Sequence, residues 1–182
     1  MKRLVGTTLA TVVVAGGLVG ATSAPAFAGC APERGTKYTI YNKSTVYKGT
    51  NLASTWMDFR SAESVTVSYE DNNTASWNAS GTAGIEAEAG VIFAKASTSF
   101  SVTIGKEWSK SKSWNYSMTA KKPKGKKQVR MRYFHEAKKF SVHKQTWVIN
   151  GNCKTLYTTK WRKTIVGPAK RSSNDVWRLE YK

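Results

Sequence analysis

Polar and apolar residues alternate along most of this chain, and this period of two is the feature that most restricts its fold. A β-strand turns successive side chains to opposite faces, whereas a helix repeats every 3.6 residues. In residues 97–119 every odd position carries Ser, Thr, Gly, Glu or Asn, and the even positions include Phe100, Val102, Ile104, Trp108, Trp114, Tyr116 and Met118. As one unbroken strand, this stretch would be about 75 Å long. The pattern predicts an unusually long extended ribbon.

Other segments show the same alternation and are rich in Val, Thr, Tyr, Trp and Phe, which fit a pleated surface. We expect strands at 36–42, 63–70, 126–136, 139–149, 155–166 and 175–182. Turn-forming residues separate them at 71–73, 121–125, 150–152 and 167–168. The sequence therefore predicts an all-β fold, an elongated and mostly antiparallel twisted sheet or sandwich with long Ser/Thr-rich strands and an amphipathic hairpin.

The amphipathic hairpin is expected at residues 82–104. The part from 81 to 96 is rich in Ala and Glu, but three glycines within ten residues would each cost a helix about 1 kcal/mol, so the alternation favours strands. With a turn at 94–97, one face of the hairpin would carry Ile85, Val91, Phe93, Phe100, Val102 and Ile104. The other would carry Thr82, Glu86, Glu88, Ser99, Ser101 and Thr103. Each arm offers roughly 9 to 11 alternating residues, the length that a tilted strand needs to cross hydrocarbon.

Residues 1–28 resemble a secretory signal peptide. Lys2 and Arg3 precede an apolar run, and Ala26-Phe27-Ala28 provides a small-residue cleavage site. The alternative is a membrane anchor, but Gly and Thr interrupt the run. We therefore expect a secreted, extracellular protein whose residues 29–182 form a single all-β domain.

The charge of the remaining chain is very uneven. Residues 29–107 contain 7 Lys or Arg against 8 Asp or Glu, whereas residues 108–182 contain 20 against 3. A half this basic is attracted to polyanions such as anionic lipid, wall polymer or nucleic acid, and charge alone does not choose among them. The densest run is an expected anionic-surface site made of Lys121, Lys122, Lys124, Lys126, Lys127, Arg130 and Arg132. The alternative is a solvated turn that keeps the protein soluble.

Cys30 and Cys153 are the only two cysteines in the chain. Export makes their oxidation plausible, and a pair so far apart has no metal-motif spacing. A disulfide here would tie the N-terminal end to a late loop and contribute roughly 4 to 5 kcal/mol in the chain-entropy model. We expect a structural disulfide, provided that the two Cα atoms come within about 7 Å.

A Ser/Thr-rich alternating segment that holds a short amphipathic hairpin, within a secreted all-β chain, resembles the stalk domain of the aerolysin-like β-pore-forming toxins, including the epsilon-toxin and mosquitocidal-toxin branch. The resemblance covers about residues 61–149 and depends on pattern, not on a short signature. It implies stalk strands at 61–80 and 105–119 and an insertion hairpin at 82–104. No large, separate receptor-binding domain is evident, since residues 29–60 and the tail from 152 could form only a small head.

The resemblance also implies a mechanism and partners. The protein would be a monomer in solution, bind an anionic membrane or cell-surface polymer, and form a homo-oligomeric ring in which each chain adds one hairpin to a membrane-spanning barrel. The apolar hairpin face would contact lipid, and Glu86, Glu88, Ser99, Ser101 and Thr103 would line the lumen. Closing the ring pairs the edge strands, as the interior of a bilayer requires.

Other functions have less support in the sequence. His135 and His143 are the only histidines, Gly-x-Ser-x-Gly is absent, and no His, Cys or Asp cluster shows metal-ligand spacing, so we expect neither an enzyme nor a cofactor. The histidines would be ordinary strand residues or an acid trigger for assembly. No nucleic-acid recognition motif occurs. The main alternative is a monomeric β-sandwich that binds a polyanion or inhibits another protein.

Overall fold

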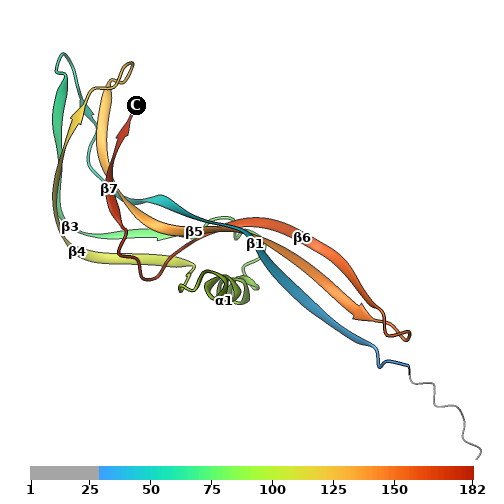
Figure 1. Ribbon diagram of the computed structural model, residues 1–182. Coiled ribbons are helices and arrows are strands. Elements are labelled where there is room, and N and C mark those ends of the chain that lie inside the picture. The colour runs from blue at the N-terminus through green and yellow to red at the C-terminus, as the bar shows by residue number, and fades with distance from the viewer. Residues whose placement is uncertain (1–28) are drawn as a thin grey trace, which may run out of the picture.

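The computed structural model describes residues 29–182 and shows an elongated, mostly β molecule (Figure 1). The expected signal peptide, residues 1–28, lies outside the described residues. The elements, in chain order, are β1 (Glu33–Ala53), β2 (Met57–Asp58), β3 (Ser64–Asn78), α1 (Ala89–Phe100), β4 (Glu107–Lys121), β5 (Gln128–Ile149), β6 (Thr155–Pro168) and β7 (Val176–Tyr181). The sheets are antiparallel, which confirms the all-β prediction.

Strand β5 is the centre of the main sheet. It pairs with β1 along nearly its whole length, with β7 and β2 near its start, and with β6 from Ala137 to Ile149. Strands β3 and β4 form a separate two-stranded ribbon. The expected strands 126–136 and 139–149 are thus one continuous strand, because the residues between them keep their pairing with β1 and β6.

At one end of the molecule the β3–β4 ribbon packs on the main sheet as a two-layer sandwich. Alternation along the ribbon turns one face inward, where Trp114 is 1% exposed and Val67 is 2% exposed. The buried residues of this core come from both layers and are Leu52, Phe59, Val67, Ala75, Trp108, Trp114, Ala120, Val129, Met131, Tyr133 and Trp177. The polar face of the ribbon remains toward solvent, as in a one-sided antiparallel sheet.

Helix α1 lies against the middle of the main sheet, beyond the end of the ribbon (Figure 1). Its buried residues Ala89, Ile92, Phe93 and Ala96 recur with helical spacing and pack with Phe140 and others in a second core. Helices of 12 residues are marginal in water, so this packing is what stabilises α1.

The third region is an arm in which β1, β5 and β6 continue without a covering layer (Figure 1). Cys30 and Cys153 form a disulfide at its tip, with their Cα atoms 5.0 Å apart, which confirms the predicted pairing. Such a bond is compatible with an oxidising, extracellular environment. It holds the start of β1 beside the loop that joins β5 to β6.

The predicted hairpin at 82–104 is wrong for this structure, because the segment contains helix α1. Only one of the three glycines, Gly90, lies inside the helix. Gly81 and Gly84 precede it with φ of 82° and 73°, so these two do not weaken α1. The expected turn at 94–97 lies within α1, and the unbroken strand expected at 97–119 begins only at Glu107.

Two predicted turns are also wrong. Residues 71–73 continue β3, where Asp71 pairs with Trp114. Residues 167–168 end β6, where Pro168 pairs with Ala137. The turns at 121–125 and 150–152 do connect strands, β4 to β5 and β5 to β6. Local turn propensity was overridden at 71–73 because β4 pairs with these residues and with those before and after them in β3.

Candidate functional site

The candidate site is the segment that joins β3 to β4, together with the surfaces that hold it. Pairing between the two strands runs without a register shift from Ser64 opposite Lys121 to Asn78 opposite Glu107. One further hydrogen bond, from the Ala79 N–H to the Lys106 carbonyl at 2.7 Å, continues that register. Strands β3 and β4 overlap the segments 61–80 and 105–119 that were predicted to be strands, with ends that differ by two or three residues, and they are each other's partners.

The end of β6 separates the two strands beyond this point. Ser80 exchanges two backbone hydrogen bonds with Val166, at 2.9 and 3.1 Å. On the other side, the Gly105 N–H bonds to Pro168 and the Lys170 N–H bonds to the Thr103 carbonyl, at 3.0 and 2.8 Å. These bonds satisfy backbone groups that would pair with each other if β3 and β4 continued as a hairpin.

Gly81 marks the point where the chain leaves the ribbon. Its φ is 82°, and a Cβ there would lie 2.2 Å from the Thr164 carbonyl oxygen. Glycine therefore permits both the backbone conformation and the close approach to β6. A cavity of about 260 Å³ adjoins the split and is lined in part by Asn78, Glu86 and Lys106.

Most of the apolar residues predicted for the membrane are covered in this structure. Ile85, Phe93 and Ile104 are buried, and Phe100 and Val102 pack against the same core at half-buried positions. Val91 is the exception, with 52% of its surface exposed. The residues predicted for the lumen are exposed or half-buried, and they are Glu86, Glu88, Ser99, Ser101 and Thr103.

An ion pair holds the start of α1 on the sheet. Lys144 of β5 donates to Oε1 of Glu88, and its ammonium also lies 5.9 Å from the ring centroid of Tyr38 on β1. The hydrogen bond from Lys144 lowers the pKa of Glu88, against the opposing effect of burial. Within residues 29–182 the buried Glu88 Oε2 has no hydrogen-bond partner, so the cost of burying this oxygen is not offset.

Two further lysines bind the backbone of the segment. Lys163 of β6 donates to the Ala83 carbonyl, and Lys43 of β1 donates to the Ser99 carbonyl at 2.9 Å. Backbone hydrogen bonds to the Glu86 carboxylate, including one from the Gly84 N–H at 2.9 Å, lower the pKa of Glu86. The segment is thus held by polar contacts at its edges and by apolar packing at its centre.

The predicted anionic-surface residues divide into two groups. Five lysines, Lys121, Lys122, Lys124, Lys126 and Lys127, are exposed at the end of β4 and in the turn to β5. Arg130 and Arg132 instead lie on β5 and both pair with Glu180 of β7, at 2.6 and 3.4 Å. The five lysines therefore lie together at one end of the molecule, whereas the two arginines form ion pairs between β5 and β7.

The two histidines occupy different environments. His143 is half-buried, and its Nε2 lies 2.9 Å from the Thr159 hydroxyl. His135 is fully buried, with Nδ1 at 2.7 Å from Asp175 Oδ1 and Nε2 at 2.9 Å from the Ala169 carbonyl. Because the carbonyl and the ionised carboxylate both accept, the two bonds form together when both ring nitrogens carry protons. The ring is stacked on Trp108, with centroids 3.8 Å apart.

Several contacts of the site lay beyond sequence reasoning. Lys144 and Tyr38 had no feature that linked them to Glu88, because they lie on different strands far along the chain. A helical signal was present, since Ala89, Ile92, Phe93 and Ala96 follow the spacing i, i+3, i+4, i+7. The segment around these residues fits both the helical spacing and the alternation of a strand, so the pattern alone does not distinguish the two.

No family model, curated protein or solved structure matches this chain. Within residues 29–182, no helix has the length and apolar character needed to span a bilayer. Nor does this described part of the chain contain a group of three or more His, Cys, Asp or Glu residues placed to hold a metal ion.

Proposed function

We propose that this protein is a secreted β-pore-forming protein of the aerolysin-like type, which binds anionic membranes, oligomerises and inserts residues 79–106 as a β-hairpin. The observation that carries the proposal is the register of the β3–β4 ribbon. Continued past Ala79 and Lys106, this register places residues that alternate along the sequence onto two separate faces.

The continued register pairs Ile85 with Phe100 and Ala83 with Val102, so that apolar residues of both arms share one face. That face is the continuation of the inward face of β3 and β4. The opposite face would pair Glu86 with Ser99 and Thr82 with Thr103. The hairpin tip would fall at Ile92 and Phe93, not at the turn predicted from 94–97. Arms of 79–91 and 94–106 exceed the roughly 9 to 11 residues that a tilted strand needs to cross hydrocarbon.

The energetics require a membrane to compensate for the release of α1. Ile85, Ile92, Phe93 and Ile104 are each at most 5% exposed. Burial of such side chains contributes about 1.5–3 kcal/mol each, so exposing all four to water costs on the order of 10 kcal/mol. Release in solution would be rare. In the inserted hairpin Ile85 and Ile104 would regain burial in lipid, whereas Ile92 and Phe93 would lie at the tip.

Oligomerisation follows from the backbone. A hairpin in hydrocarbon has two unpaired edges, and each unsatisfied group costs several kcal/mol, so hairpins from several chains must close a ring. In that ring the polar face would line a lumen with Glu86 and Glu88, which would favour cations. Secretion is part of the proposal, and the disulfide of the arm and the signal-like residues 1–28 support it.

A pair of glutamate substitutions at neighbouring positions tests the inserted state. Val91 is exposed in α1, and a Cβ at Gly90 would meet nothing within 4 Å, so V91E and G90E should both fold. In the proposed hairpin the same carboxylate would face lipid in V91E and the lumen in G90E. Position 91 adjoins the tip, where a lipid-facing carboxylate costs less than the roughly 2–4 kcal/mol of an Arg or Lys at the bilayer midplane, but the cost recurs in every chain of the ring. V91E should therefore reduce dye release from anionic vesicles, and G90E should retain it.

A crosslink tests the movement itself. Ser80 and Val166 are directly paired, so S80C/V166C should form a disulfide that holds the end of β6 between the strands. Release should then require reductant, whereas either single variant should act without it. Reductant also cleaves the native disulfide, so the same experiment in a C30S/C153S background shows which effect comes from the engineered bond alone. Equal release by V91E, G90E and the oxidised double variant, or monomers only on unboiled gels with every lipid, would reject the proposal.

A second function, a monomeric β-sandwich that binds a polyanion or another protein, is favoured by one observation. The centre of the 82–104 segment is packed in a core, with Ile92 and Ala96 both fully buried, as expected of a rigid binder. This function predicts a 1:1 complex and a segment that stays protected from hydrogen exchange on vesicles. The pore predicts that protection of α1 is lost there.

A further inference from the structure

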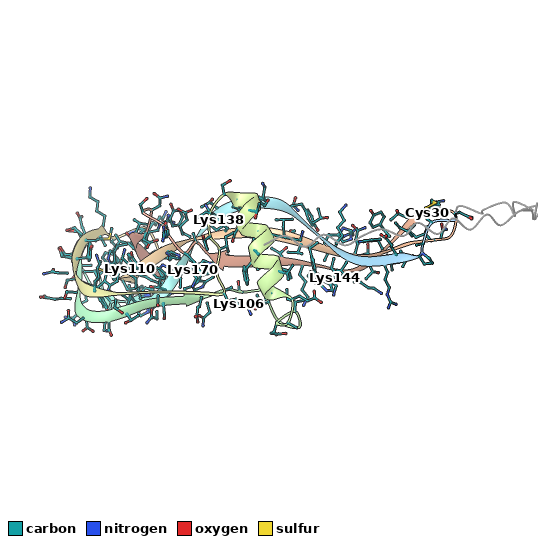
Figure 2. The ribbon with its side chains drawn as sticks, turned by 90° about the horizontal axis from the view of Figure 1, so that it is seen from below. Cys30, Lys106, Lys110, Lys138, Lys144 and Lys170 are labelled. Atoms are coloured by element: carbon teal, nitrogen blue, oxygen red, sulfur yellow. A yellow bond between two sulfur atoms is a disulfide. The ribbon has the colours of Figure 1, made fainter. Side chains whose placement is uncertain are left out.

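A groove runs between β4 and the loop 169–175 that joins β6 to β7. One part has a volume of about 610 Å³ and the adjoining part about 480 Å³, and Lys110, Ser172, Ser173 and Asp175 line both. Figure 2 labels Lys110 and Lys170, which line the groove from its two sides. Residues far apart in sequence are thus brought to one concave surface.

The groove carries an excess of positive charge. Lys110 and Lys112 come from β4, and Lys170 and Arg171 come from the loop. Among residues 29–182, Lys110, Lys170 and Arg171 take part in no ion pair. The ammonium of Lys112 is held by the Tyr116 hydroxyl at 2.8 Å and by the Trp114 ring, whose centroid lies 4.5 Å away.

The carboxylate among the groove's lining residues, Asp175, is already hydrogen-bonded to residues of β5. Asp175 accepts from the Tyr133 hydroxyl at 3.1 Å and from the Glu136 N–H at 3.3 Å, in addition to its contact with His135. Its side chain is 6% exposed. The negative charge is therefore directed into the protein, and the open surface presents mainly cations and hydroxyls.

The loop is held in place before any ligand arrives. Asn174 donates to Glu136 Oε2 at 2.7 Å, and the Ser172 hydroxyl lies 3.2 Å from the same oxygen. The hydrogen bond from Lys138 lowers the pKa of Glu136, so this anchor remains ionised. A loop that is already ordered loses less conformational entropy on binding.

The floor and one end of the groove are aromatic. Trp108 forms part of the floor in one half, and Tyr116, Tyr133 and Trp177 line the other half. Tyr116 and Val176 are 39% and 37% exposed. The indole N–H of Trp177 is buried and has no hydrogen-bond partner within residues 29–182. Cations beside an amphipathic aromatic surface suit a ligand with an anionic head and an apolar continuation.

We propose that this groove binds the phosphate of an anionic phospholipid head group, with Lys110, Lys170 and Arg171 as its ligands and the aromatic end against the glycerol and upper acyl chain. The inference rests on the proposed function, because it names the lipid group that the pore-forming protein would recognise before insertion. It assigns recognition to a built groove, in addition to the exposed lysines of the 121–127 turn.

The test compares two triple variants that remove equal charge. K110Q/K170Q/R171Q neutralises the groove, and K154Q/K160Q/R162Q neutralises two lysines and one arginine that are exposed on the arm. Binding of glycerol 3-phosphate and of inorganic phosphate is measured by calorimetry. Binding to phosphatidylcholine vesicles with and without phosphatidylglycerol is measured by sedimentation. Loss of three charge-assisted contacts should weaken binding by at least about tenfold in the groove variant, and the arm variant should stay within about twofold.

The results distinguish a lipid phosphate from a free phosphate, and they test the groove separately from the pore. Binding of vesicles with phosphatidylglycerol well above that of the soluble phosphates, lost only in the groove variant, supports the lipid head group. Equal binding of both sources indicates a site for free phosphate and overturns the lipid assignment. Equal weakening in both triple variants, or no binding by the wild type, overturns the groove. Groove-dependent lipid binding without dye release leaves the groove assigned and rejects the pore.

Discussion

Asp175 Oδ1 lies 2.7 Å from His135 Nδ1, and this buried contact joins the loop before β7 to the centre of β5. Burial alone would raise the pKa of Asp175. The hydrogen bond and charge of His135, with hydrogen bonds from the Glu136 N–H and Tyr133, together outweigh burial, so the pKa lies below its ordinary value. Trp108 covers the imidazole on its face. The same contact therefore links the sandwich core to the cationic groove.

D175N should destabilise the protein strongly. The substitution replaces a buried carboxylate that is hydrogen-bonded to His135, Tyr133 and the Glu136 N–H. Hydrogen bonds to a charged group contribute about 1.5–3 kcal/mol each, so losing them should cost about 3 kcal/mol or more. The free energy of unfolding, measured with urea at pH 7, should fall by this amount. D58N, at an exposed position of β2, is the matched control and should change it by less than about 0.5 kcal/mol. A D175N protein as stable as D58N would contradict this account of the contact.

Stability should decline in acid through four carboxyl groups. Hydrogen bonds from lysines lower the pKa of Glu88 and Glu136, backbone N–H groups lower that of Glu86, and the pKa of Asp175 is also lowered, so each group takes up its proton at lower pH when folded than when unfolded. Their contribution is complete above the unfolded values, about 4 to 4.5, and is lost as the pH falls through the lowered folded values. Urea unfolding at pH 7, 5, 4 and 3 should show the decline below about pH 4.5, with a smaller decline in E136Q. An unchanged slope in E136Q would exclude Glu136 from the effect.

K144M should loosen α1 without unfolding the sheet. The ion pair with Glu88 is partly exposed, so its loss should cost less than about 1 kcal/mol of global stability. Hydrogen exchange of residues 89–100 should become faster, and dye release, if α1 must detach, should start sooner. K139M, an exposed lysine on the same strand, is the control. Unchanged exchange in K144M would show that apolar packing alone holds the helix.

C30S/C153S should lower the free energy of unfolding. The bond closes a sequence separation of 123 residues, and the chain-entropy model assigns about 4–5 kcal/mol to a loop of this size. Reduced wild-type protein should show the same loss by urea unfolding. A midpoint equal to that of the oxidised wild type would indicate that the arm is held by strand pairing alone.

Strand positions were largely predictable because the period-two pattern reflects a local property of the backbone. Ser64–Asn78 and Glu107–Lys121 form strands where the alternating Ser and Thr residues indicated them. The disulfide was also predictable, since the chain has two cysteines, which allow one pairing, and the sequence favours an oxidising environment. The turn at 71–73 failed because propensity is local, whereas the partner of those residues is a distant strand.

The state of residues 82–104 was not determined by the sequence alone. Its apolar residues satisfy both a hairpin and the helical spacing of Ala89, Ile92, Phe93 and Ala96. Tertiary structure selects the helix for two reasons. The end of β6 forms backbone hydrogen bonds with Ser80 and Gly105, and Phe140, Val142 and Ile165 cover the apolar face of α1. It also decided which cations share a surface, since only the fold brings Lys110 and Lys170 to the same groove. Sequence determined the alternation and the charge; long-range pairing determined which surface each residue serves.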